Sequence, residues 1–245
     1  MAMIIKARLS DRYFVSDNER FLLLKFELVE PNEIIFEAGQ YVSLKISDKG
    51  ERRSYSIAST PDNKHGFSLL AEIVPEGKGS NYLMSLVPGD SVEILGPMGR
   101  FVVAPSSTVA GGGEKNKLLF VATGSGIVPI WSMINDLLIN KKVLTPVRLH
   151  WGMKREEDLF WIDNLERLAE AHPDFVYDVV LSRGSEEWGL CRGHVQDCLA
   201  RDFGNGELSK WSGYVCGAKE IVLDICAKLE ELSMPKDVIY HEKFT

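Results

Sequence analysis

The sequence predicts a β plus α/β fold: an antiparallel six-stranded β-barrel followed by a doubly wound domain with a parallel sheet. Three observations predict this division. Residues 1–104 contain short β-branched and aromatic runs separated by turn residues. Residues 105–117 are small, polar and rich in glycine, which is typical of a linker. Residues 118–245 alternate buried-strand patterns with amphipathic helical patterns, as right-handed βαβ units do.

The individual elements follow from local periodicity. In the first domain, strands are predicted at residues 4–9, 21–28, 41–46, 55–58, 67–74 and 91–95. Ser80 is a suitable N-cap and predicts a helix over residues 80–86. In the second domain, strands are predicted at residues 118–122, 147–151, 175–181, 214–216 and 238–240. Helices are predicted between them, at residues 130–138, 159–168, 195–200 and 221–232.

Composition narrows the class of protein. The 245 residues include 28 basic and 35 acidic side chains, a formal net charge of −7. This acidic balance argues against bulk attraction to nucleic acid or to anionic membranes. An apolar fraction of 45% is that of a globular protein, and no apolar run reaches the roughly 18 residues of a membrane span. The first residues lack a secretory leader pattern, so we expect a cytoplasmic protein.

The cysteines and histidines show no metal-binding spacing. Cys191, Cys198, Cys216 and Cys226 form neither a CxxC pair nor the cluster of a plant-type iron–sulfur domain. In a cytosolic chain we expect four reduced, mostly buried thiols. The five histidines form no visible triad or ligand set, so no metal is expected.

The sharpest local signal is the sequence ATGSGIVP at residues 122–129. It follows a buried strand and opens a helix. Gly124 and Gly126 let the backbone approach a bound group closely, and Pro129 suits the first helical turn. Free amides at a helix N-terminus attract a pyrophosphate. The alternative is a tight strand–helix turn without a ligand, and the ordinary dehydrogenase fingerprint GxGxxG is absent.

Two further motifs lie in the first domain. Strand alternation places Arg53 and Tyr55 of the sequence RSYS on one face, where a guanidinium suits phosphate and an aromatic side chain suits a planar ring. The sequence GKGSNYL at residues 77–83 is a glycine turn into a capped helix, a second candidate anion site. The alternatives are an ordinary exposed strand and an ordinary helix cap.

Taken together, the motifs resemble a known family. RxYS at residues 53–56, GxxSNYL at 77–83, GPxGxF at 96–101, ATGSGIVP at 122–129 and CG at 216–217 occur in the order typical of ferredoxin–NADP(+) reductases. The resemblance covers nearly the whole chain. It implies a stand-alone flavoprotein with FAD bound by the barrel and NADPH (or NADH) bound by the α/β domain.

The resemblance also assigns roles to residues of the barrel domain. Arg53 is expected to bind the FAD pyrophosphate, Tyr55 to lie against the isoalloxazine ring, and the Ser56 hydroxyl to lie near flavin N5. The expected phosphate cradle consists of Gly77, Gly79 and Ser80. Backbone groups beside the flavin are expected from Glu72, Ile73 and Val74.

In the α/β domain, the resemblance implies nucleotide contacts from Thr123, Gly124, Ser125 and Gly126. Cys216, followed by Gly217, is expected near nicotinamide C4. Glu242 is expected to relay a proton towards Ser56, which makes Ser56, Cys216 and Glu242 the candidate catalytic residues. Phe244 is expected to cover the flavin or the nicotinamide, although a frayed C-terminus is the alternative for this short tail match.

The choice of nucleotide depends on the end of the strand at residues 175–181. Ser182 and Arg183 follow it, where the adenosine ribose is expected, and Arg192 is a further candidate. A cation and a hydroxyl suit a 2′-phosphate, which favours NADPH over NADH.

The reaction implied is hydride transfer from the nucleotide to FAD, followed by one-electron transfer. No fused ferredoxin, globin or flavodoxin-like domain is expected, so the acceptor is a separate ferredoxin, flavodoxin or oxygenase component. Lys49, Arg52 and Arg100 are candidates for a basic rim that steers an acidic acceptor. The alternatives are a reductase that releases free flavin and a non-catalytic nucleotide-binding module of a complex.

Overall fold

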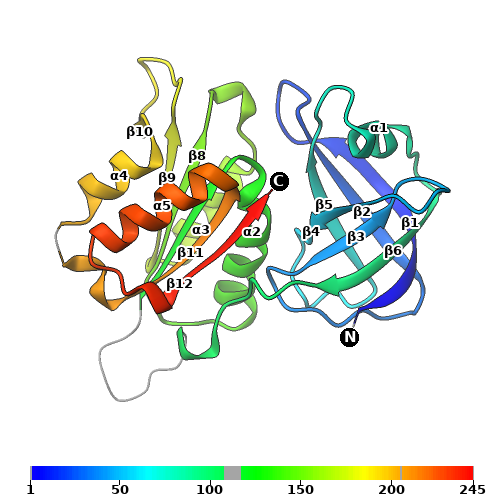
Figure 1. Ribbon diagram of the computed structural model, residues 1–245, viewed down its shortest axis with the longest axis horizontal. Helices are drawn as coiled ribbons and strands as arrows, with labels where there is room; N and C mark the ends of the chain where they lie inside the picture. Colours follow the sequence, from blue (N-terminus) through cyan, green and yellow to red (C-terminus); the bar gives the residue numbers. More distant parts are fainter. Residues whose placement is uncertain (1, 108–116, 205, 245) are drawn as a thin grey trace. The chain divides into compact units, whose positions relative to one another are not determined.

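A computed structural model describes residues 2–107, 117–204 and 206–244 (Figure 1). Most of the predicted linker, residues 108–116, lies outside these ranges. The chain divides into two compact units. Unit 1 comprises Met1–Val102 and Trp131–Asn140, and unit 2 comprises Val103–Ile130 and Lys141–Thr245.

Unit 1 contains the predicted antiparallel six-stranded sheet. Its strands are β1 (Met3–Phe14), β2 (Phe21–Glu30), β3 (Tyr41–Lys45), β4 (Arg52–Ser56), β5 (Gly66–Glu72) and β6 (Ser91–Met98). They lie in the order β4-β3-β6-β1-β2-β5. The predicted antiparallel six-stranded sheet is present, but it does not close into a barrel. Among the described residues, one isolated bridge, between Ile57 just after β4 and Leu69 of β5, links the two edges.

Alternating side chains explain how this sheet forms its core. In β1, Ile5, Ala7 and Leu9 are fully buried, whereas Lys6 and Arg8 between them are exposed. This period of two is that of a strand with one buried face. The inward residues join one apolar cluster with side chains from the other strands, including Leu24, Leu44 and Ile94. Burial of this face fixes the register, because a slip by one residue exposes every apolar side chain.

The helix of unit 1 begins two residues earlier than predicted. α1 spans Lys78–Ser85, and Gly77 occupies its N-cap position without a side-chain cap. The prediction that Ser80 caps the helix is therefore wrong. Ser80 lies within the first turn, where its hydroxyl accepts a hydrogen bond from the Val74 amide instead, at 2.9 Å.

Unit 2 is the predicted doubly wound parallel sheet. Its strands are β7 (Lys117–Thr123), β8 (Val147–Met153), β9 (Phe175–Leu181), β10 (Cys191–Arg192), β11 (Trp211–Ala218) and β12 (Ile239–Phe244). They lie in the order β10-β9-β8-β7-β11-β12, all parallel. The strand order reverses between β7 and β11, so the topological switch point lies there. The sequence did not predict β10, since two residues carry no periodic pattern.

The second half of the sequence contains the helices α2 (Ile127–Asn135), α3 (Ile162–Ala171), α4 (Val195–Asp202) and α5 (Lys219–Glu231), and α2 from Trp131 onward belongs to unit 1. Shorter helical turns are η1 (Pro105–Ser107), η2 (Gly124–Gly126), η3 (Asp136–Asn140), η4 (Glu156–Asp158), η5 (Glu207–Lys210) and η6 (Lys236–Val238). Figure 1 shows α4 and α5 in front of the parallel sheet. Their apolar residues, among them Leu199 and Ile225, pack with Val121 and Val215 in a second core.

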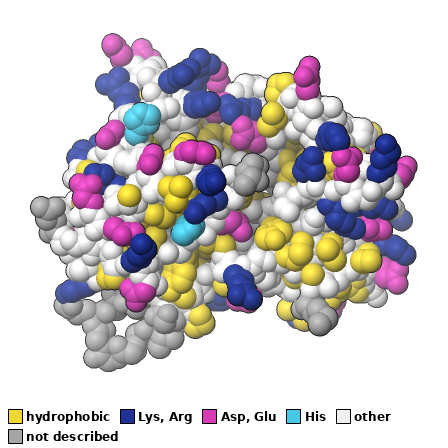
Figure 2. Space-filling model, viewed as in Figure 1, with side chains coloured by type: hydrophobic (Ala, Val, Ile, Leu, Met, Phe, Trp, Pro, Cys, Tyr) yellow, Lys and Arg dark blue, Asp and Glu magenta, His cyan; other side chains and the backbone are white. Residues whose placement is uncertain are grey.

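Charge is distributed without a dominant sign on the face shown in Figure 2, where acidic and basic side chains are interspersed over both units. No helix in the described part of the chain has both the length and the apolar character needed to cross a membrane.

Candidate functional site

The carboxyl end of β7 is built for close backbone contact with a ligand. Thr123 ends the strand, and η2 connects it to α2. Gly124 has a φ of +55°, and a Cβ there would point into open space. Gly126 is held against β11, where a Cβ would overlap the carbonyl group of Cys216. The Trp151 indole donates to the Gly124 carbonyl oxygen at 3.1 Å and holds the turn.

The adjacent ends of β11 and β12 complete this arrangement. Parallel register places Cys216 opposite Ala122 of β7 on one side and Glu242 of β12 on the other. At Gly217 a Cβ would overlap the Thr123 hydroxyl. Residues distant in sequence therefore meet at the switch point, where open α/β sheets bind their ligands.

Two buried polar atoms at this point have no hydrogen-bond partner among the described residues: Thr123 Oγ1 and Glu242 Oε2. Unpaired buried polar atoms are rare, and they are satisfied when a bound group supplies donors and acceptors. A nicotinamide carries such groups on its carboxamide, and the glycine turn leaves space for the nucleotide phosphates. The residues present therefore fit the predicted nucleotide.

Burial also changes the acid–base properties of this site. It raises the pKa of Glu242 to about 7. Burial, with a smaller contribution from the Glu242 charge, raises the pKa of the Cys216 thiol well above its usual value. The thiol is therefore neutral at physiological pH, which excludes a thiolate nucleophile at this position.

In unit 1, β4 and α1 bring the predicted flavin residues together. Arg53 is exposed and Tyr55 half-buried on one face of β4. At Gly79 a Cβ would lie 2.6 Å from the Tyr55 hydroxyl and 3.1 Å from Arg53 Cγ. Only glycine lets the first turn of α1 approach both side chains. Burial raises the pKa of Tyr55 to about 12, so its hydroxyl stays protonated.

The first turn of α1 supplies amides that no side chain caps, next to an exposed guanidinium. Uncapped amides and Arg53 form a cradle of the kind that binds phosphate. A planar aromatic beside it suits the flavin ring. The residues present therefore fit FAD. Ser56, predicted to face flavin N5, is buried at the end of β4.

Backbone groups of residues 72–74 are expected beside the flavin, but two of their amides are already hydrogen-bonded within the chain. The amides of Ile73 and Val74 already donate within the chain, to the Arg20 carbonyl and the Ser80 hydroxyl. Their N–H groups are thus used for holding the segment in place. The Glu72 side chain accepts from Arg20 Nε at 3.0 Å.

The predicted ribose-binding residues gather at one sheet edge. Ser182 and Arg183 follow β9 directly, and their amides donate to the carbonyls of Met153 and Lys154. Arg192 pairs with Leu181 in the parallel β9–β10 ladder. All three predicted side chains are exposed. At the opposite edge, Phe244 is half-buried and pairs with Ala218, so the tail is a strand and not a frayed end up to this residue.

The three proposed rim residues do not form one rim. Lys45 at the end of β3 pairs with Arg52, and Lys49 follows in the connecting hairpin. Arg100 lies two residues beyond Met98, which pairs with Tyr41 at the start of β3. Lys49 and Arg100 therefore lie near opposite ends of β3. The Arg52 guanidinium donates hydrogen bonds to Glu93 and to the Ser43 carbonyl oxygen.

The cysteines also differ from expectation. Cys191 of β10 and Cys198 of α4 form a disulfide with a Cα–Cα distance of 6.7 Å, whereas Cys216 and Cys226 are free. The expectation of four reduced thiols is therefore wrong for this pair. The strand–turn–helix path brings two buried positions seven residues apart together, which no cysteine spacing rule anticipates.

Comparisons with known proteins agree with this geometry. Residues 6–103 match the family described as Oxidoreductase FAD-binding domain, and residues 120–227 match Oxidoreductase NAD-binding domain. Ferredoxin–NADP reductase B of Sorangium cellulosum (strain So ce56) is 34% identical over 231 residues, covering 90% of each chain.

Other relatives are longer. The reductase subunit of an aromatic O-demethylase from Amycolatopsis sp. is 31% identical over 94% of this chain, which spans 65% of that relative. The crystal structure of the Amycolatopsis cytochrome P450 reductase GcoB superposes with a TM-score of 0.89 at 27% identity, covering 100% of this chain and 70% of that one. From the paired domains, the strand ends and these relatives, the chain belongs to the ferredoxin–NADP(+) reductase-like family of FAD- and NAD(P)-binding oxidoreductases.

Proposed function

We propose that this oxidoreductase takes hydride from NADPH, or NADH, and passes electrons one at a time to a separate ferredoxin, flavodoxin or oxygenase component. The observation that carries the proposal is the meeting of Thr123, Gly126, Cys216 and Glu242 at the switch point. Two buried polar atoms there find no partner within residues 2–107, 117–204 and 206–244. The names of the relatives, a ferredoxin–NADP reductase and reductase components of oxygenases, support the acceptor class.

Within unit 1, Arg53 and the first turn of α1 would hold the FAD pyrophosphate, and Tyr55 would lie against the isoalloxazine. Bound FAD supplies the redox chemistry, accepting two electrons as hydride and releasing them singly. The exposed Arg53 guanidinium contributes charge-assisted hydrogen bonds of roughly 1.5–3 kcal/mol each. Tyr55 gives up little freedom, because it already packs against the apolar core.

Within unit 2, Thr123, Gly124, Ser125 and Gly126 hold the nucleotide. The neutral Cys216 thiol positions the nicotinamide by packing. Glu242 holds a proton at its buried carboxyl near neutral pH, because its pKa is about 7. We assign Glu242 to holding this proton and Phe244 to excluding water from the nicotinamide. In unit 1 we assign the Ser56 hydroxyl to a hydrogen bond with the flavin.

The proposal is tested with the purified full-length protein. We expect bound FAD that persists through gel filtration, bleaching on anaerobic addition of NADPH, and reduction of two equivalents of a one-electron acceptor per NADPH. Protein that stays colourless after incubation with excess FAD contradicts the proposal. Loss of FAD on the column, with activity restored by free flavin, supports the flavin-releasing alternative instead.

Arg183, Ser182 and Arg192 form the proposed site for the 2′-phosphate of NADPH. Replacing Arg183 by alanine removes a charge-assisted hydrogen bond, so kcat/KM for NADPH is expected to fall about tenfold or more while that for NADH changes little. Arg167→Ala, at another exposed arginine, on α3, serves as the control. A preference for NADH that Arg183→Ala leaves unchanged contradicts this assignment.

The same proposal assigns one role to each part of the chain. Residues 1–104 bind FAD, residues 105–117 connect, and residues 118–245 bind NAD(P)H. A cytoplasmic location is part of the proposal, because reduced nicotinamide nucleotides and small one-electron carriers are available there. The support for the division is the pair of family matches, which end and begin on either side of the connecting segment.

A further inference from the structure

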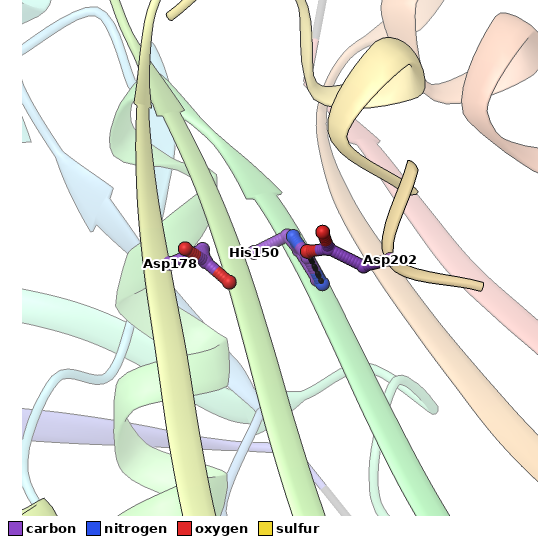
Figure 3. Close-up of side chains that lie close together, drawn as sticks. All are labelled: His150, Asp178 and Asp202. Carbon is purple, nitrogen blue, oxygen red and sulfur yellow. Dashed lines mark ion pairs between the residues drawn. The ribbon is translucent and has the colours of Figure 1, made fainter. Parts of the chain in front are cut away.

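A second group of titratable side chains lies in the middle of the parallel sheet, outside the nucleotide site. His150 is on β8, Asp178 is its register partner on β9, and Asp202 is the last residue of α4. Figure 3 shows the three side chains gathered beside the sheet, with an ion pair between His150 and Asp202. One potential ligand atom from each residue lies within 4.8 Å of the others.

His150 is an unusual member of a protein core. Its side chain is fully buried, and neither ring nitrogen has a hydrogen-bond partner among the described residues. The Asp202 carboxylate is 3.8 Å from Nε2, beyond hydrogen-bond distance. Burial lowers the pKa of His150 to about 4. A buried imidazole that lacks a hydrogen-bond partner is satisfied by a ligand placed between it and the carboxylates.

The two carboxylates are oriented towards the same space. Arg201 Nε donates to Asp202 Oδ1 at 2.9 Å, and the other oxygen, Oδ2, is the one that faces His150. Metal-binding carboxylates are commonly held in this way by an outer partner.

The surrounding charges select the kind of ion. Arg201 is bound to Asp202, and the Arg148 guanidinium lies 5.2 Å above the Phe203 ring. Both cations act on His150. These two positive charges offset the negative charges of the two carboxylates. A hard cation such as Mg²⁺, which is held mainly by charge, is therefore attracted only weakly. An ion that forms a strong bond to imidazole nitrogen is favoured instead.

We propose that His150, Asp178 and Asp202 bind a divalent transition-metal ion of the zinc class, through one imidazole nitrogen and two carboxylate oxygens. Such an ion links β8, β9 and α4 and is structural, since the cluster lies away from the residues at the strand ends. The site departs from the sequence-based expectation of no metal, because strand register and the end of α4, not chain spacing, bring the ligands together.

The test uses the full-length flavoprotein after chelator treatment and dialysis, with Co²⁺ as the spectroscopic probe. We expect saturable binding of one Co²⁺ per chain, a visible absorption band of the coordinated ion, and a rise in the unfolding temperature. His150→Leu replaces an unsatisfied buried polar ring with an apolar side chain, so it is expected to fold and to lose all three responses. Asp178→Val, on the same strand ladder, is expected to behave in the same way.

His172→Leu, outside the cluster, is the matched control and is expected to bind Co²⁺ like the unaltered protein. Retained FAD absorbance and circular dichroism establish that each variant is folded. Absence of saturable Co²⁺ binding overturns the proposal. Equal binding by His150→Leu and the unaltered protein also overturns it, since this outcome means an adventitious ion only.

Discussion

At the residue scale, the two candidate cofactor sites use opposite kinds of polar group. Arg53 in unit 1 presents an exposed permanent charge, which suits a phosphate that arrives with its own charge. In unit 2, Glu242 and Thr123 present buried polar atoms that have no partner in the described part of the chain, which suit a ring with both donors and acceptors. The difference follows from burial, because a buried carboxyl avoids ionisation whereas a guanidinium stays charged.

Tyr55 is expected to control how firmly FAD is retained. Tyr55→Ala removes ring stacking worth about 0.5–1.5 kcal/mol beyond burial, so FAD affinity is expected to fall roughly twofold to twelvefold. Fluorescence titration of the FAD-stripped protein measures this change. Tyr55→Phe keeps the ring and is expected to bind FAD nearly normally, and Tyr13→Ala is the surface control. An unchanged affinity in Tyr55→Ala removes the stacking role.

Glu242 is expected to make stability depend on pH. Its pKa rises from 4.5 to about 7 on folding, so between these values the folded chain holds a proton that the unfolded chain releases. The free energy of unfolding therefore falls as the pH rises through this window and is highest, for this group, below its lower end.

Glu242→Gln removes this dependence. Compared with the variant, the unaltered protein is expected to lose stability progressively as the pH rises from about 4.5 to about 7. Urea unfolding at a series of pH values measures the difference, and Glu230→Gln on α5 is the control. Parallel stability curves for the two proteins would falsify a raised pKa at this position.

At the scale of elements, local sequence patterns predict whether a segment is a helix or a strand better than they predict its first and last residues. The strand at residues 175–181 has the predicted bounds. The helix predicted at residues 221–232 begins two residues earlier and ends one residue earlier, because α5 spans Lys219–Glu231. Periodicity reports which side chains face the core, and it fades at element ends where side chains are solvated. Helix α1 shows the same limit, because Ser80 is used for holding Val74 and not for capping.

The contact between the glycine turn and β11 is expected to be intolerant of any side chain. Gly126→Ala places a Cβ into the Cys216 carbonyl group, and the resulting shift is expected to cost about 1–3 kcal/mol and to weaken nucleotide binding. Thermal unfolding and NADP⁺ titration measure both effects. Gly189→Ala, where a Cβ meets nothing within 4 Å, is the control and is expected to be neutral. A Gly126→Ala protein of normal stability contradicts this packing.

At the scale of the whole molecule, two separate apolar cores support two separate binding surfaces. The family matches assign one cofactor class to each half of the chain. A ligand that binds only the folded state stabilises it, and the effect grows with the logarithm of the ligand concentration above Kd. Each cofactor is therefore expected to leave its own footprint along the chain.

Hydrogen exchange measured by mass spectrometry tests this expectation. Added FAD is expected to slow exchange at residues 52–56 and 77–83, and NADP⁺ at residues 122–129 and 182–192. The β1 segment at residues 5–9 is an internal reference, since it is buried irrespective of ligand. NADP⁺ protection confined to unit 1 is the result that contradicts the assignment of the second half.

The sequence by itself determined the two-part architecture, the element types and the motifs of the cofactor sites. These follow from side-chain period and from local turn chemistry, which neighbouring residues carry. The tertiary structure decided which distant residues meet: Thr123 with Gly217, Cys216 with Glu242, His150 with Asp178 and Cys191 with Cys198. Such pairs depend on strand order and register, which are set by burial of whole faces and are not encoded by any single segment.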